Sequence, residues 1–259
     1  MSEPRPLVWN YGGGTQSIAI AVLLAQGQLP RPDCIVMADT GREAQETWDY
    51  TAAHVAPLLA SLGLTIAIAP HTLATVDLYA ADERVLIPAY TATGQLRNFC
   101  SNEWKGRVVE RYLRTLGYGP RRPIRQWLGI SLDEIGRLKP SGIAWIERAW
   151  PLVFDHPLRR SECRARILAY GLPEPPRSSC WMCPYRGNAE WRRLRDAYPA
   201  DWARAVAFDE QIRARDTEHA LYVHRSAVPL AAADLGTPDA PPSPLFGNIT
   251  ECDSGQCWM

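Results

Sequence analysis

The stretch VWNYGGGTQSIAIAVLL, near the amino terminus, places three glycines between an extended apolar run and a helical pattern. Glycine permits a positive φ and lets a ligand approach the main chain closely. A helix that starts directly after such a turn points free N–H groups, and the positive end of its dipole, at the turn. The spacing predicts an anion site made of seven consecutive residues: Tyr11, Gly12, Gly13, Gly14, Thr15, Gln16 and Ser17.

Cysteine is the second residue type whose spacing indicates chemistry. Cys180 and Cys183 form a CxxC pair in a proline-flanked loop, a spacing typical of a metal site or a redox pair. Cys100 and Cys163, each near the start of an expected helix, would bring the ligands to four. Four thiolates suit a [4Fe-4S] cluster or a structural zinc. If Cys163 is instead a buried helix residue, three protein ligands remain.

Two further thiols, Cys252 and Cys257, lie in the segment ECDSGQC at the end of the sequence. The Pro, Gly and Ser content of this tail predicts mobility. Thiolate attack followed by resolution through a neighbouring thiol is ordinary exchange chemistry, so we expect both cysteines to act in catalysis. The alternative is an inert terminus.

Basic residues gather around the middle cysteines. Lys105 follows Cys100 by five residues, and Arg186 follows Cys183 by three. Guanidinium groups pair with phosphate oxygens, so a basic face here could hold a nucleotide or a nucleic-acid backbone. We expect Lys105 to act in catalysis and Arg186 to bind the nucleotide, against the alternative that both are solvated.

Apolar and helical patterns alternate along the first 150 residues, which predicts a parallel sheet with helices on both faces. Five strands are expected, in LVWNY, CIVMAD, LTIAIA, IRQWLGI and GIAWIERAWPL. The fold class is therefore a doubly wound, mostly parallel α/β sheet with a small helical, cysteine-bearing part. We expect a nucleotide-binding domain over residues 1–150, a helical cysteine-cluster region over 151–225 and a flexible tail over 226–259.

Composition excludes several classes of protein. A hydrophobic content of 46% with 22% charged residues argues against disorder and fibrous structure. The formal net charge is zero, so overall charge gives no case for nucleic-acid binding, although local patches could provide one. No apolar run is long enough to cross a bilayer, and we expect a cytoplasmic protein. Five histidines without metal-binding spacing are expected to be surface or core residues: His54, His71, His156, His219 and His224.

Two motifs resemble a known superfamily. GGGTQS resembles the pyrophosphatase (PP) loop, SGGxDS, of the adenine nucleotide alpha hydrolases, although Gly12 replaces the serine and Gln16 the aspartate. ADTGREAQETWDY resembles the DTGxExxET segment of the PAPS reductase-like branch. The resemblance implies that Asp39, Thr40 and Gly41 bind the nucleotide at the end of the second strand. Glu43 and Glu46 would then lie on the first turn of the following helix.

Several further segments look like phage and bacterial members of the same branch, among them CSNEWKGRVV, GISLDEIGRLKPS and ECDSGQCWM. This resemblance implies a HUP-type, PP-loop fold. It favours ATP or an adenylylated sulfate as the ligand, Mg²⁺ as a cofactor, and a [4Fe-4S] cluster over zinc at the cysteines.

Three functions remain open. The leading hypothesis is an ATP-dependent sulfur-transfer enzyme that adenylylates an acceptor, releases pyrophosphate and then inserts sulfur. The second is a sulfonucleotide reductase that releases sulfite through Cys252 or Cys257. The third is a nucleotide-binding interaction or defence protein without turnover. Expected partners are an adenine nucleotide, a sulfur donor or thiol reductant and a tRNA or DNA acceptor, with a homodimer as one arrangement and no membrane.

Overall fold

The chain divides into two compact units. Unit 1 comprises the described parts of residues 1–74 and 104–178, and unit 2 those of residues 75–103 and 179–259. Each unit is therefore built from segments that are far apart in the sequence. The computed structural model describes residues 4–73, 78–215 and 220–236.

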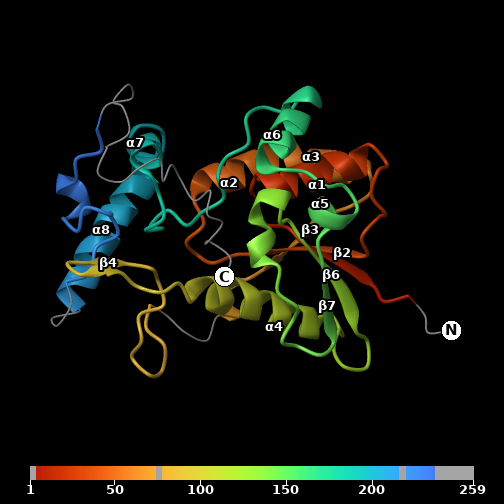
Figure 1. The fold of residues 1–259 in the computed structure, drawn as a ribbon, viewed down its shortest axis with the longest axis horizontal. Helices are drawn as coiled ribbons and strands as arrows, with labels where there is room; N and C mark the ends of the chain where they lie inside the picture. Colours follow the sequence, from red (N-terminus) through yellow and green to blue (C-terminus); the bar gives the residue numbers. More distant parts are fainter. Residues whose placement is uncertain (1–3, 74–77, 216–219, 237–259) are drawn as a thin grey trace. The chain divides into compact units, whose positions relative to one another are not determined.

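A five-stranded parallel sheet forms the centre of unit 1 (Figure 1). Its strand order is β3-β2-β1-β6-β7, and Trp9 of β1 lies opposite Ile35 of β2 and Trp127 of β6. The doubly wound α/β sheet predicted from the sequence is confirmed. The strands are β1 Leu7–Asn10, β2 Cys34–Ala38, β3 Ile66–Ala69, β6 Ile124–Leu128 and β7 Ile146–Ala149.

Helices cover both faces of this sheet, with α1, α3 and α6 on one side and α4 on the other (Figure 1). The helical segments are α1 Thr15–Ala25, α2 Gln45–Tyr50, the π-helical η1 Thr51–Val55, α3 Ala56–Ser61, η2 His71–Leu73, α4 Arg107–Thr115, η4 Leu132–Arg137, α5 Pro151–Phe154 and α6 Arg160–Ala169. Because the sheet is buried on both faces, its central strands are nearly continuous apolar runs.

Alternate residues of each strand enter two different cores. Trp9 and Met37 pack against α1, while Val8 and Val36 pack against α4. Helix α1 is apolar almost all round, since its buried residues run from Ile18 to Leu24. This helix therefore lies between the sheet and the outer helices, and its first turn is held rigidly at the edge of the sheet.

The boundary of unit 1 differs from the one expected at residue 150. Helix α6 packs on α1, and its Cys163 and Ile167 are both fully buried in the same core as Trp9. The apolar spacing of Cys163 and Ile167, four residues apart on one helical face, explains this packing. Residues 151–178 are therefore part of the sheet unit, not of a separate cysteine-bearing region.

Unit 2 contains a short antiparallel hairpin and two packed helices. Main-chain hydrogen bonds in both directions, of 2.8 and 2.9 Å, join Tyr90 to Tyr222. Trp191 and Trp202 meet edge to face, with ring centroids 6.3 Å apart, where the two helices pack. The elements are β4 Tyr90–Thr91, β5 Gly94–Gln95, α7 Asn188–Ala197, α8 Pro199–Arg215 and η5 Leu230–Ala232.

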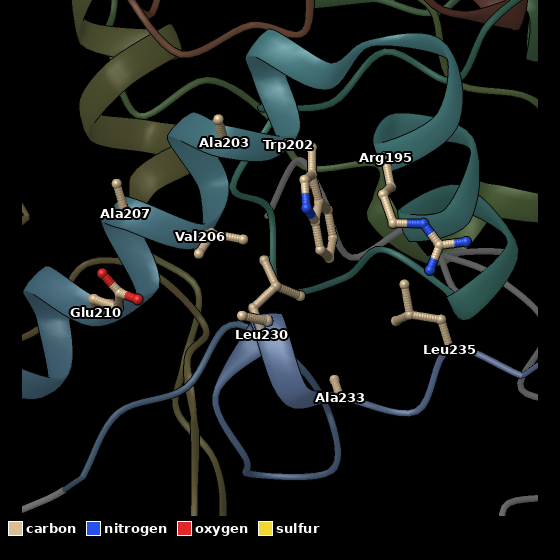
Figure 2. A pocket seen from close by; sticks show the side chains of 10 residues that line it. Arg195, Trp202, Ala203, Val206, Ala207, Glu210, Leu230, Ala233 and Leu235 are labelled. Carbon is tan, nitrogen blue, oxygen red and sulfur yellow. The ribbon is translucent and has the colours of Figure 1, made fainter.

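A hollow of about 460 Å³ lies in unit 2, between α8 and η5. Figure 2 shows the side chains that line it. Trp202 and Val206 of α8 lie across from Leu230, and the side chains of Arg195 and Glu210 also line the hollow. None of the site residues predicted from the sequence is among those that line it. In the described parts of the chain, no helix combines the length and the apolarity needed to span a bilayer.

Candidate functional site

The glycine turn leaves β1 in a conformation that needs glycine. Gly13 has φ +74°, and a Cβ at this position would lie 2.5 Å from Cγ2 of Thr47. A Cβ on Gly14 would lie 3.3 Å from Cβ of Ser178. The turn also closes on itself, because the N–H of Gly12 donates to Oγ of Ser17 at 2.9 Å. The conformation of the turn is thus fixed, and Thr47 and Ser178 pack tightly against its main chain.

Helix α1 begins immediately after this turn. Its N-cap is Gly14, which has no side chain to accept hydrogen bonds from the first N–H groups. The first intrahelical bond of the segment runs from the N–H of Ile18 to the carbonyl of Gly14. The first N–H groups of α1 therefore have no acceptor within the helix. They and the positive end of the helix dipole point toward the turn, an arrangement suited to an anion.

The turn lies at the point where the strand order reverses. From β1 the chain continues to β2 and β3 on one side, whereas β6 and β7 lie on the other. Gly129, just after β6, approaches the turn so closely that a Cβ there would lie 3.2 Å from Oγ of Ser17. The amide of Gln16 donates to Oγ of Ser131 at 3.3 Å. Ligands of open α/β sheets bind at this reversal, beyond the carboxyl ends of the strands.

The Asp-Thr-Gly turn follows β2 at the same edge. The N–H of Gly41 donates to Oδ1 of Asp39 at 2.7 Å, and the N–H of Arg42 donates to Oγ1 of Thr40 at 3.1 Å. Gly41 has φ +65°. The predicted residues Asp39, Thr40 and Gly41 thus form a tight turn beside the glycine turn, one strand away.

A buried carboxylate lies beneath the glycine turn. Glu43 has a side chain that is only 1% exposed, and Nζ of Lys105 donates to its Oε2 at 3.2 Å. Its Oε1 accepts hydrogen bonds from Oγ of Ser178 at 2.9 Å and from Oγ1 of Thr47 at 3.2 Å. Thr47 and Ser178 are also the residues that contact Gly13 and Gly14. The Glu43 carboxylate therefore fixes the side chains on which the glycine turn packs.

This placement corrects the expectation that Glu43 lies on the first turn of a helix. Helix α2 begins at Gln45 with Ala44 as its N-cap, and only Glu46 lies on its first turn. Glu43 precedes the helix and makes a buried ion pair with Lys105, which lies near the end of the π-helical segment η3 (Ser101–Gly106). A lone buried charge would be costly, and the ammonium group offsets it.

The side chains of Tyr11 and Ser17 are buried in unit 1 and stabilise the glycine turn. Tyr11 is 1% exposed, and its hydroxyl is 3.0 Å from Oγ1 of Thr51. Burial raises the pKa of Tyr11 above its usual value. Its ring meets Trp9 edge to face. Tyr11 therefore fixes the end of β1 and presents no hydroxyl to a ligand.

Arg186 holds the CxxC loop of unit 2. Its guanidinium group is buried and donates to the carbonyls of Cys180, at 3.1 Å, and of Ser179, at 3.4 Å. The N–H of Cys183 donates to the carbonyl of Cys180 at 3.1 Å, which makes the pair a tight turn. The structure thus gives Arg186 a structural contact with the thiol loop, whereas the sequence predicted nucleotide binding.

The four expected metal ligands belong to different units, with Cys163 in unit 1 and Cys100, Cys180 and Cys183 in unit 2. Cys163 is fully buried in the core of unit 1, and burial raises the pKa of its thiol to about 12. Sγ of Cys100 donates to Oδ1 of Asn98 at 3.2 Å in unit 2. Over residues 4–73, 78–215 and 220–236, no three Cys, His, Asp or Glu side chains are arranged to hold a metal ion. The four-cysteine metal site therefore stays a prediction.

The remaining expected catalytic cysteines, Cys252 and Cys257, lie outside the described residues. Five residues at the site were missed. Thr47 and Ser178 support the glycines, Gly129 and Ser131 follow β6, and His71 contacts Asp39. The rule that ligands bind beyond strand ends would have found Gly129 and Ser131, since they follow the strand IRQWL directly.

No protein-family model matches the chain, and no curated protein matches it. Among solved structures, the chain is similar to the U34-tRNA thiolase NcsA from Methanococcus maripaludis with its [4Fe-4S] cluster. The two share 16% sequence identity with a TM-score of 0.43, over 80% of this chain and 71% of that chain. A likeness with so low a TM-score carries no argument about activity, so the function must be argued from the site.

Proposed function

We propose that the protein binds ATP at the glycine turn and transfers its adenylyl group to an acceptor, with release of pyrophosphate, as the first half of a sulfur-transfer reaction. One observation carries the proposal. A glycine turn that tolerates no side chain lies at the reversal point of a parallel sheet, at the start of α1, directly above the buried Glu43–Lys105 pair.

The glycine turn suits pyrophosphate as a leaving group. An acceptor oxygen would attack the α-phosphorus, the bond between this phosphorus and the bridging oxygen to the β-phosphorus would break, and the electron pair would leave with pyrophosphate. Charge develops on the leaving group in that step, and main-chain N–H groups at the start of α1 would stabilise it. Mg²⁺, which we expect to accompany ATP, would neutralise part of the same charge.

Lys105 is the cation nearest to this step in our proposal. Its side chain is 13% exposed and its ammonium group is held by Glu43, so its position is fixed before the nucleotide arrives. A charge that needs no reorganisation stabilises a transition state more effectively than a mobile one. We therefore assign Lys105 to the phosphates and Glu43 to the positioning of Lys105.

The sulfur half of the proposal depends on the segment that follows Ser178. Ser178 packs on Gly14, and Cys180 comes two residues later in the sequence. A persulfide sulfur on one cysteine of the CxxC pair would attack the activated carbon, and AMP would leave with the bonding electrons. The second thiolate would then attack the cysteine sulfur of the resulting mixed disulfide, which releases the thiolated product and joins Cys180 to Cys183. A thiol reductant and a sulfur donor would restore the persulfide.

The test is a product assay with labelled ATP, Mg²⁺ and a thiol, with bulk tRNA, DNA or no acceptor in separate reactions. We expect AMP and pyrophosphate in equal amounts, in a reaction that needs the acceptor. Formation of ADP and phosphate would contradict the proposal. Lys105→Met should lower kcat by at least about 100-fold, whereas Lys139→Met, at the other lysine of the chain, should leave it unchanged.

The alternatives give different products. Sulfite released from an adenylylated sulfate without ATP would identify a sulfonucleotide reductase. Binding of ATP without any product would identify a nucleotide-binding interaction protein. Either result would replace the proposed function.

A further inference from the structure

His71 and Asp39 form a pair at the carboxyl edge of the sheet. The N–H of Asp39 donates to the carbonyl of Ala69 at 2.8 Å, which continues the β2–β3 ladder beyond both strands. His71 follows Ala69 by two residues and is thereby brought to the same edge. Its Nδ1 lies 3.3 Å from Oδ2 of Asp39.

The surroundings fix the orientation of this pair. Oδ1 of Asp39 accepts the N–H of Gly41, so the carboxylate cannot turn away from the histidine without losing that bond. A Cβ on Gly41 would lie 3.3 Å from Cγ of His71 and 3.5 Å from its Cδ2, so the imidazole rests on the glycine. In the neutral tautomer that donates its Nδ1 proton to this carboxylate, the Nε2 lone pair is an acceptor. The side chain of His71 is still 57% exposed.

The pair lies beside the glycine turn along the row of strand ends. In the order β3-β2-β1, Asp39 follows the neighbour of β1 and His71 follows the strand beyond it. Neighbouring strands are about 4.8 Å apart, so the end of β3 lies about 10 Å from the end of β1. For a nucleotide whose phosphates occupy the turn, we place the ribose on the β2–β3 side, next to the Asp39–Gly41 turn.

We infer that Nε2 of His71 accepts a hydrogen bond from a ribose hydroxyl of the bound nucleotide, so that the site selects adenine nucleotides with free hydroxyls over those with a 3′-phosphate. This inference rests on the proposed function. A hydroxyl supplies the proton that Nε2 lacks, and Oδ2 of Asp39 orients the ring. A 3′-phosphate would instead bring negative charge toward the Asp39 carboxylate.

The direct test compares the dissociation constants of ATP, 2′-deoxy-ATP and 3′-deoxy-ATP, in the presence of Mg²⁺. For the wild type we expect one of the deoxy analogues to bind about 2- to 13-fold more weakly than ATP, the range of a single hydrogen bond. His71→Ala should bind ATP more weakly than the wild type does, by a similar factor. It should bind ATP and that deoxy analogue with equal affinity. His71→Gln, whose amide oxygen can accept the same hydroxyl, should recover part of the difference.

Two controls separate a binding role from a structural one. His156→Ala changes an exposed histidine whose Nε2 contacts the carbonyl of Gln28, and it should keep the wild-type preference. In a second experiment, AMP should bind the wild type more tightly than adenosine 3′,5′-bisphosphate, and Asp39→Asn should narrow this gap.

The outcomes also distinguish this inference from the function on which it rests. If His71→Ala discriminates between ATP and its deoxy analogues as well as the wild type does, the inference is wrong and the proposed function stands. Equal affinity of the wild type for ATP and both analogues would also show that the inference is wrong, and it too would leave the proposed function standing. If the wild type binds no adenine nucleotide, both proposals are overturned.

Discussion

In unit 1 the buried carboxylate of Glu43 receives hydrogen bonds from three side chains, whereas in unit 2 the buried carboxylate of Asp209 accepts two main-chain N–H groups. Those N–H groups belong to Val223 and Leu230, at 2.9 and 2.8 Å, and Arg213 pairs with the same carboxylate. Side chains can be redirected when a ligand arrives, but main-chain bonds cannot be redirected without moving the chain. Asp209 thus joins three segments of unit 2, whereas Glu43 lies beside the glycine turn to which we assign the nucleotide.

Replacement of Asp209 should give the largest effect. Asp209→Ala leaves two main-chain N–H groups and Arg213 without their partner, so we expect the free energy of unfolding to fall by about 3–5 kcal/mol. Chemical denaturation measures it. Asp196→Ala is the matched control, because its pair with Arg195 is exposed to solvent and should contribute little to the free energy of unfolding. If both variants lose the same stability, the assigned role of Asp209 is wrong.

Substitutions in the glycine turn test the unit 1 half of this comparison. Gly13→Ala combines a positive φ with the close approach of Thr47, and we expect a loss of about 2–4 kcal/mol in stability together with loss of ATP binding. Gly27→Ala has a similar φ of +66° in open space, so it isolates the backbone cost, about 1–2 kcal/mol. ATP binding by Gly13→Ala at wild-type affinity would refute the assignment of the turn.

The pH dependence of unit 2 follows from His224. Burial lowers the pKa of this histidine to about 4, and its ring nitrogens contact Ser226 Oγ at 2.6 Å and Asn188 Oδ1 at 3.1 Å. An unfolded chain takes up the proton near pH 6.5, so stability should be constant above that pH and fall as the pH drops from 6.5 to 4.

The expected loss over this interval is on the order of 2–3 kcal/mol. His224→Gln should remove this part of the pH dependence, as measured by denaturation at pH 7.5 and 4.5, while His156→Gln should retain it. A variant without His224 that keeps the wild-type slope would show that another group is responsible.

The smallest effect is expected at Cys163. Cys163→Ala removes a buried sulfur from the core of unit 1 and should lower stability by about 1 kcal/mol. Because its pKa is raised to about 12, the thiol should resist iodoacetamide at pH 8 in the folded protein. Mass spectrometry locates the modified cysteines. Any iron or zinc content should be the same in Cys163→Ala as in the wild type, and a loss of metal would restore Cys163 as a ligand.

The sequence predicts the sheet of unit 1 well because its signals are local. β1, β2 and β3 are apolar runs next to helical patterns, and the glycine turn follows the first of them. The contact between Glu43 and Lys105 joins residues 62 positions apart, and no local pattern indicates it. The burial of Cys163 had a local signal, its spacing of four from Ile167, but the thiol side chain equally suits a metal ligand.

Unit 2 was less predictable because the contacts that hold it together join residues far apart in the sequence. The helical region expected from the sequence over 151–225 includes two separate helices in unit 2, α7 and α8, which are interrupted at Tyr198. Pro199 lacks a main-chain N–H and therefore begins a new helix more readily than it continues one. The bonds of Asp209 to Val223 and Leu230 depend on how the irregular segment 220–236 folds back, which neither periodicity nor propensity encodes.

The sheet order has a consequence for protein synthesis. β1 ends at residue 10, but its neighbour β6 begins only at residue 124. At about 5–20 residues per second, a ribosome needs roughly 6–25 s to make the intervening chain. Until then one side of an apolar strand has no partner and can associate with other nascent chains. Chaperones that cover this strand during synthesis should therefore raise the amount of folded protein that a cell obtains.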